Sequence, residues 1–91
     1  MKLFGDKNHP HTGYVYAVLT GTYVGEMLVY VQKHDDTYQF ISIPKNINRE
    51  VPADKFDLGI SEKIVEPVEK IPNNIFSLLR KQFDYNLIKT K

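Results

Sequence analysis

The chain contains no cysteine among its 91 residues. It therefore has no disulfide framework, no thiolate metal site and no cysteine nucleophile, and it suits a reducing compartment. No apolar run approaches the roughly 20 residues that a membrane span needs. Residues 1–13 also lack the apolar core of a signal peptide. These absences predict a soluble cytoplasmic protein with no membrane partner.

The chain also lacks an excess of charge of either sign. Its 12 basic and 11 acidic residues leave a net charge of +1, which argues against a nucleic-acid binder that depends on bulk charge. The distribution is uneven, because residues 45–69 hold four basic and six acidic side chains, and residues 70–91 hold five basic and one acidic. A solvated helix face with a basic last turn accounts for this asymmetry, and a partner-binding patch is the alternative.

Motifs of catalysis and cofactor binding are missing as well. No glycine-rich loop leads into a Lys-Ser or Lys-Thr pair, and no serine lies in a strand–serine–helix elbow. The adjacent Asp35 and Asp36 have the pattern of a solvated turn, and His9 and His11 are too few to hold a metal ion. The sequence predicts a protein that is not an enzyme and that has no catalytic, cofactor-binding or metal-ligating residues.

Residues 13–31 are the most β-rich part of the chain. Valine, tyrosine and leucine dominate two runs, 14–19 and 26–31, and glycines 21 and 25 lie in the connection between them. Such side chains pack well on a pleated surface, and glycine supplies the positive φ of a tight hairpin. Both faces of the first run are apolar, which indicates a strand covered on both sides or closed into a small barrel.

Further strands are predicted downstream. The polar residues 34–37 predict a hairpin turn, and residues 38–43 predict a third strand that Pro44 ends. Residues 45–61 are irregular, with a single helical turn expected after a Val-Pro pair, and residues 63–68 are a further candidate strand. Four apolar residues of the irregular segment have the spacing to reach the core: Val51, Phe56, Leu58 and Ile60.

Residues 72–86 predict a helix. Proline and asparagine at its beginning are start signals, and Asn86 is a plausible end. Four residues form one apolar stripe along it: Ile75, Phe76, Leu79 and Phe83. Their burial would contribute roughly 6–12 kcal/mol before conformational entropy is subtracted. We therefore expect the helix to be an integral part of the fold.

These segments predict one domain over residues 1–91. It consists of an N-terminal arm (1–12), a β-rich barrel or sheet (13–68) and a C-terminal helix (72–86). The fold class is mainly β with one C-terminal helix, either a small SH3-like barrel or a strongly curled antiparallel sheet.

The segment 18–26, VLTGTYVGE, resembles the KOW-type hairpin of SH3-like barrels, in which an apolar strand end meets a glycine, a short segment, a second glycine and a second apolar strand. The resemblance covers residues 13–31. Val24 stands where that family usually has a basic residue, and Leu28 where it often has a further glycine. The resemblance implies an SH3-like fold and binding to RNA, ribosomes or transcription machinery. In style, the rest of the chain resembles small accessory proteins of Gram-positive mobile elements and phages.

Tyrosines concentrate in the first three predicted strands, which also have basic residues nearby. If the tyrosines share an outer face, they form a stacking platform for a peptide or a single-stranded nucleic acid, with the basic residues available for phosphates. Cross-strand aromatic pairing is the structural alternative. The candidate binding surface comprises Tyr14, Tyr16, Tyr23, Tyr30, Tyr38, Lys33, Lys45 and Arg49.

The sequence thus predicts a non-catalytic binding module. Its partner is expected to be another protein or a second copy in a homodimer, bound through exposed tyrosines or an unpaired strand edge. The alternative is an RNA- or DNA-binding accessory protein that uses tyrosine stacking and scattered basic residues.

Overall fold

A computed structural model describes residues 10–43 and 45–89 of the chain. In these residues five strands form one antiparallel sheet with the order β4-β3-β2-β1-β5. The predicted arm lies largely outside the described residues. The elements in chain order are β1 (Tyr14–Val18), β2 (Met27–His34), β3 (Thr37–Ile43), β4 (Ile47–Pro52), α1 (Ala53–Ser61), β5 (Val65–Lys70) and α2 (Asn73–Lys89).

The predicted β-rich segment folds as a hairpin. β1 pairs with β2, with Val15 opposite Val29, and the connecting loop has Gly21 and Gly25 at φ values of 102° and 88°. β2 runs three residues further than predicted, and β3 returns antiparallel to it from a turn in which Asp35 has a φ of 54°. Aspartate tolerates this left-handed conformation better than most residues.

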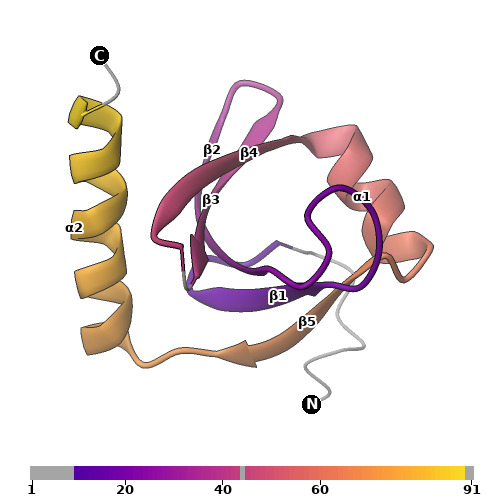
Figure 1. Cartoon of the computed structure of the whole chain (residues 1–91), viewed down its shortest axis with the longest axis horizontal. Coiled ribbons are helices and arrows are strands. Elements are labelled where there is room, and N and C mark those ends of the chain that lie inside the picture. The colour runs from indigo at the N-terminus through magenta and orange to yellow at the C-terminus, as the bar shows by residue number, and fades with distance from the viewer. Residues whose placement is uncertain (1–9, 44, 90–91) are drawn as a thin grey trace.

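Both faces of the sheet are covered, as the apolar character of β1 predicted. On the face that packs against α2, Val15, Val29 and Ile41 form a core cluster with Phe83. The opposite face, which we call the inner face, carries a second buried cluster of mainly aromatic residues closed by α1: Tyr16, Val18, Leu28, Tyr30, Phe40 and Phe56. Figure 1 shows the sheet curling between α2 on one side and α1 on the other.

The sheet is curled but not closed. β4 and β5 are its two edges, and within residues 10–43 and 45–89 they form no ladder with each other. Of the two predicted architectures, the structure is the curled antiparallel sheet. No helix in this part of the chain is long and apolar enough to cross a membrane.

The segment predicted to be irregular is the main correction. It contains a six-residue strand, β4, and a nine-residue helix, α1, where the sequence predicted a loop with one helical turn. The strand was missed because its polar residues do not follow the apolar alternation of a half-buried strand. It forms through pairing with β3, where Arg49 lies opposite Phe40. Val51, Phe56 and Ile60 reach the core as predicted, but Leu58 is 55% exposed.

The last strand and the last helix are also displaced from their predicted bounds. β5 begins two residues later than predicted, and its Pro67 is tolerated because an edge strand needs hydrogen bonds on one side only. α2 continues three residues past Asn86, whose side-chain amide bonds the Asn46 carbonyl and the Asn48 side chain. Phe76, Leu79 and Phe83 pack on the sheet as predicted, but Ile75 is 42% exposed.

Candidate functional site

The free edge of β4 carries unpaired backbone groups. Ala53 N–H donates to the Asp36 carbonyl at 2.7 Å and extends the β3–β4 register, in which Val51 lies opposite Tyr38. In an antiparallel ladder only every second residue pair exchanges backbone hydrogen bonds. Counting back from Ala53, the backbones of Val51 and Arg49 therefore face β3, and those of Asn48 and Glu50 point away from it. These outward N–H and C=O groups form no hydrogen bond with the described residues.

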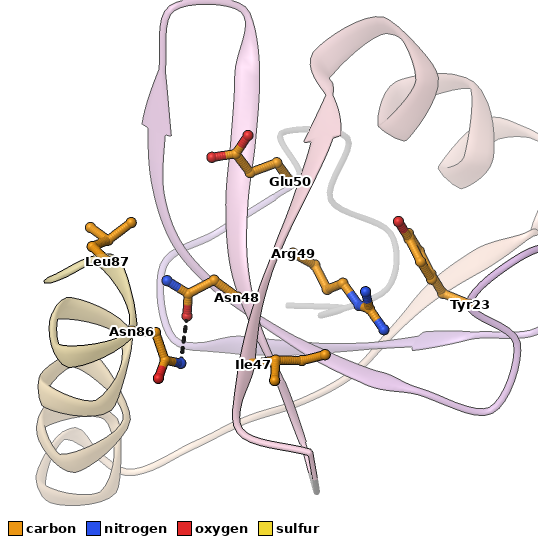
Figure 2. Close-up of a pocket in the computed structure, with 7 residues that line it drawn as sticks. All are labelled: Tyr23, Ile47, Asn48, Arg49, Glu50, Asn86 and Leu87. Carbon is orange, nitrogen blue, oxygen red and sulfur yellow. Dashed lines mark hydrogen bonds between the residues drawn. The ribbon is translucent and has the colours of Figure 1, made fainter. Parts of the chain in front are cut away.

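A hollow of about 530 Å³ runs along this edge. β4 forms its floor, Tyr23 of the β1–β2 loop stands on one side, and Asn86 and Leu87 at the end of α2 stand on the other. Figure 2 shows this arrangement, with Tyr23 and the α2 residues on opposite sides of the strand. The floor residues are Ile47, Asn48, Arg49 and Glu50.

A second hollow of about 510 Å³ continues from the first toward α1. Tyr23 and Glu50 line both hollows, so we treat them as one site and call it the edge trough. This second part is mainly apolar. Its lining residues include Val18, Leu28, Val51, Phe56, Leu58, Ile64 and Val65, with Thr20, Thr22 and Lys55 also present.

The buried carboxylate of Glu26 connects several side chains on one side of the trough. Glu26 accepts two hydrogen bonds from Arg49, at 2.8 and 3.1 Å, and one from the Ser42 hydroxyl at 2.7 Å. Lys45 approaches the same carboxylate at 3.4 Å. The hydrogen bond from Arg49 is the main reason that the pKa of Glu26 falls from 4.5 to about 2, although burial opposes that change.

Arg49 also links the floor of the trough to its Tyr23 side. Its guanidinium lies 4.3 Å from the centre of the Tyr23 ring, within the range of a cation–π contact. Arg49 comes from the edge strand, whereas Tyr23 and Glu26 come from the β1–β2 connection. This side chain therefore fixes the position of the connection relative to the free edge.

The predicted tyrosine platform is wrong for two of its five rings. Tyr16 is fully buried and Tyr30 is 8% exposed, because their side chains lie inside the curl of the sheet. Tyr16 packs edge-to-face on Phe56 at 5.4 Å, and its hydroxyl accepts a hydrogen bond from His11 N–H. Burial raises the pKa of Tyr30 above 10. Tyr30 lies opposite Phe40 of β3 with ring centres 5.5 Å apart, which is the cross-strand aromatic pairing that was the structural alternative, whereas Tyr16 packs against α1.

The other three tyrosines are half-buried and do not form one surface. Tyr14 packs against the ring of His11, and Tyr38 packs edge-to-face on Tyr30 and Phe56. Burial is the main cause that raises the pKa of Tyr38. Only Tyr23 of the five lines the edge trough.

The three predicted basic residues are likewise dispersed. Arg49 is bound to Glu26, and Lys45 reaches the same carboxylate while its side chain stays 57% exposed. Lys33 lies 5.7 Å from the centre of the Tyr38 ring, near the β2–β3 hairpin. The structure therefore brings Tyr23, Arg49 and Lys45 into one region and leaves Lys33 outside it.

Sequence reasoning missed Glu26, Asn48, Glu50 and Leu58 as residues of a site. Glu26 had been assigned to a strand start, and no local pattern indicates that Ser42 and Arg49 converge on it. Asn48 and Glu50 lie in β4, a strand that was not predicted. A polar strand that ends in proline is a usable signal of a sheet edge.

No protein-family model, curated protein or solved structure matches this chain. Within the described part of the chain, no group of three or more His, Cys, Asp or Glu side chains is placed to hold a metal ion. The fold and the site define a small curled antiparallel sheet with an open, partly apolar edge.

Proposed function

We propose that this chain is a non-catalytic protein-binding module that holds a segment of another protein in the edge trough. The observation that carries this proposal is the coincidence of an unpaired strand edge with an apolar hollow of about 510 Å³. Hollows of this size that combine apolar walls with a few polar groups are typical binding sites.

Exposed apolar side chains around the trough support the proposal. Leu58 lines it from α1, while Leu19 and Val24 belong to the loop whose residues 20–23 form its wall. All three are exposed by 47% or more. Single exposed apolar residues are common, so the direct support comes from Leu58, which is exposed and lines the hollow itself.

The chemistry of the trough favours binding over catalysis. Its lining residues in the described part of the chain include no histidine, serine or cysteine. The nearby Glu26 carboxylate has a low pKa and accepts hydrogen bonds from Arg49 and Ser42, which makes it a weak base near neutral pH.

Site-specific photocrosslinking in the native host tests the proposed function. A benzophenone amino acid replaces Leu58 at the trough in one variant and Leu78 on α2 in the matched control, since both side chains are well exposed. We expect a discrete protein adduct from position 58 and none from position 78. Adducts from neither position, or from position 78 alone, would contradict the proposal.

Binding of RNA or DNA is the alternative function, and fewer of the residues predicted for it are available to a nucleic acid. Two of the five tyrosines are buried, and Arg49 is neutralised by Glu26. A complex with about three phosphate contacts has a log–log salt slope of about −2 to −3. Fluorescence polarisation with labelled single- and double-stranded oligonucleotides at low salt checks this alternative. We expect no saturable binding, and a slope in that range would favour nucleic acid instead.

A further inference from the structure

We infer that the occupant of the edge trough is an extended peptide segment that adds to the sheet as a strand beside β4. This inference rests on the proposed function and specifies its partner. The partner would present apolar residues to the hollow at the α1 end of β4 and an acidic residue to Lys55.

The backbone of β4 supplies the first argument. The outward N–H and C=O groups of Asn48 and Glu50 form no hydrogen bond with the described residues, whereas the Val51 and Arg49 backbones face β3. An extended chain satisfies such a row of alternating donors and acceptors, which is the basis of strand addition in peptide recognition. A compact apolar ligand would leave these groups unbonded.

The shape of the trough supplies the second argument. Tyr23 and the Asn86–Leu87 end of α2 stand on either side of the free edge, so the space follows the direction of the strand (Figure 2). Pro52 sets the limit of pairing, because it has no N–H and α1 begins at the next residue. Beyond Glu50, side chains of the partner would meet the apolar hollow between Leu28, Phe56 and Val65.

The two edges of the sheet differ, and this difference favours β4. The opposite edge strand, β5, has Pro67 in its middle and exposed Glu66, Glu69 and Lys70 around it. Proline and charged side chains are the usual means by which proteins prevent pairing at an edge. β4 has its proline only at the last position. Its charged side chains, Arg49 and Glu50, are held by Glu26 and Gln39, so the backbone in its middle is open to pairing.

Charge around the trough defines one end of the partner. The carboxylates of Glu26 and Glu50 are already engaged, the first by Arg49 and the second by the Gln39 amide at 3.0 Å. Lys55 is exposed, forms no ion pair with the described residues, and lines the α1 end. Lys45 precedes the other end of β4, but it lines neither hollow and already approaches Glu26 at 3.4 Å. An acidic residue at the α1 end of a bound segment would complement Lys55.

Selection from a displayed library of random short peptides, followed by amide hydrogen exchange with the enriched peptides, tests the inference. We expect enriched peptides to alternate apolar and polar residues and to carry an acidic residue near one end. At saturation they should slow exchange of the Asn48 and Glu50 amides by about tenfold or more. The Arg49 and Val51 amides, already facing β3, are the internal control and should change little.

A matched pair of variants at Glu50 isolates the backbone contribution. Glu50→Pro removes the outward N–H without removing a bond to β3, whereas Glu50→Ala removes the same side chain and keeps the N–H. We expect the proline variant to lose peptide binding by about tenfold or more and the alanine variant to retain most of it. Circular dichroism of both variants verifies that they are folded.

Three results would overturn the inference. The first is the absence of enriched peptides, and the second is peptide binding that leaves the Asn48 and Glu50 amides unprotected. The third is protection of these amides that rises with protein concentration without peptide, which would identify a second copy of the chain as the occupant. Crosslinking at position 58 together with the second result would leave the proposed function standing and remove only the strand-addition mode.

Discussion

Glu26 and Arg49, 23 residues apart in the chain, form a two-pronged ion pair with N···O distances of 2.8 and 3.1 Å. The carboxylate side chain is 10% exposed and the guanidinium side chain is 22% exposed. The pair joins the β1–β2 connection to the edge strand, and Ser42 of β3 completes it. Planar, bidentate contacts of this kind are stronger than single hydrogen bonds and fix geometry as well.

The protein should lose stability in acid because of Glu26. Its pKa is about 2 in the folded protein and 4.5 for the free group, so the unfolded chain binds the proton first as pH falls. Ionised Glu26 therefore adds about 3 kcal/mol to the free energy of unfolding. This stabilisation is complete above pH 4.5 and disappears as pH falls toward 2. Urea unfolding between pH 7 and pH 2 measures it. Glu26→Gln should flatten that dependence, and an unchanged slope would contradict the assignment.

Arg49→Ala should destabilise the protein by about 2–4 kcal/mol, because it leaves a largely buried carboxylate without its main partner. The matched change Lys45→Ala should cost about 1 kcal/mol or less, since that side chain is 57% exposed. Urea unfolding at neutral pH compares the two variants. Equal effects would mean that Arg49 does not dominate the contacts of Glu26.

Phe56→Ala should cost about 3–5 kcal/mol. The Phe56 ring is 1% exposed and lies 5.3–5.4 Å from the ring centres of Tyr16, Tyr38 and Phe40. Leu58→Ala, two residues along the same helix, should change the free energy of unfolding by about 0.5 kcal/mol or less because Leu58 is exposed. A small effect of the phenylalanine change, measured by urea unfolding, would argue against α1 as the cover of the inner face.

Two glycine-to-alanine changes should have opposite signs. Gly59→Ala lies within α1, where glycine is a poor helix former, and its new Cβ would contact Val65 Cγ2 at 3.4 Å. A gain of about 0.5–1 kcal/mol is expected. Gly25→Ala has open space but a φ of 88°, so a loss of about 1 kcal/mol is expected. Thermal unfolding distinguishes the pair, and a loss at position 59 would show that Val65 cannot accommodate the methyl group.

Local pattern was sufficient to predict the elements that carry their own apolar signal. The β-branched and aromatic residues of β1, β2 and β3 and the stripe of Phe76, Leu79 and Phe83 are visible in short windows of the chain. Each of these segments must bury apolar side chains, and the 2-residue and 3.6-residue periods report which faces do so. The sequence by itself therefore determined a β-rich domain with a C-terminal helix and with both faces of its first strand covered.

Tertiary structure decided the rest. β4 is a strand because β3 provides its hydrogen-bonding partners, not because of its own apolar residues. The direction of curl placed Tyr16 and Tyr30 inside, and no local period reports the direction in which a sheet curls. Glu26 and Arg49 meet only after three strands have paired. Contacts between segments distant in the chain depend on register and curvature, and these are properties of the assembled sheet.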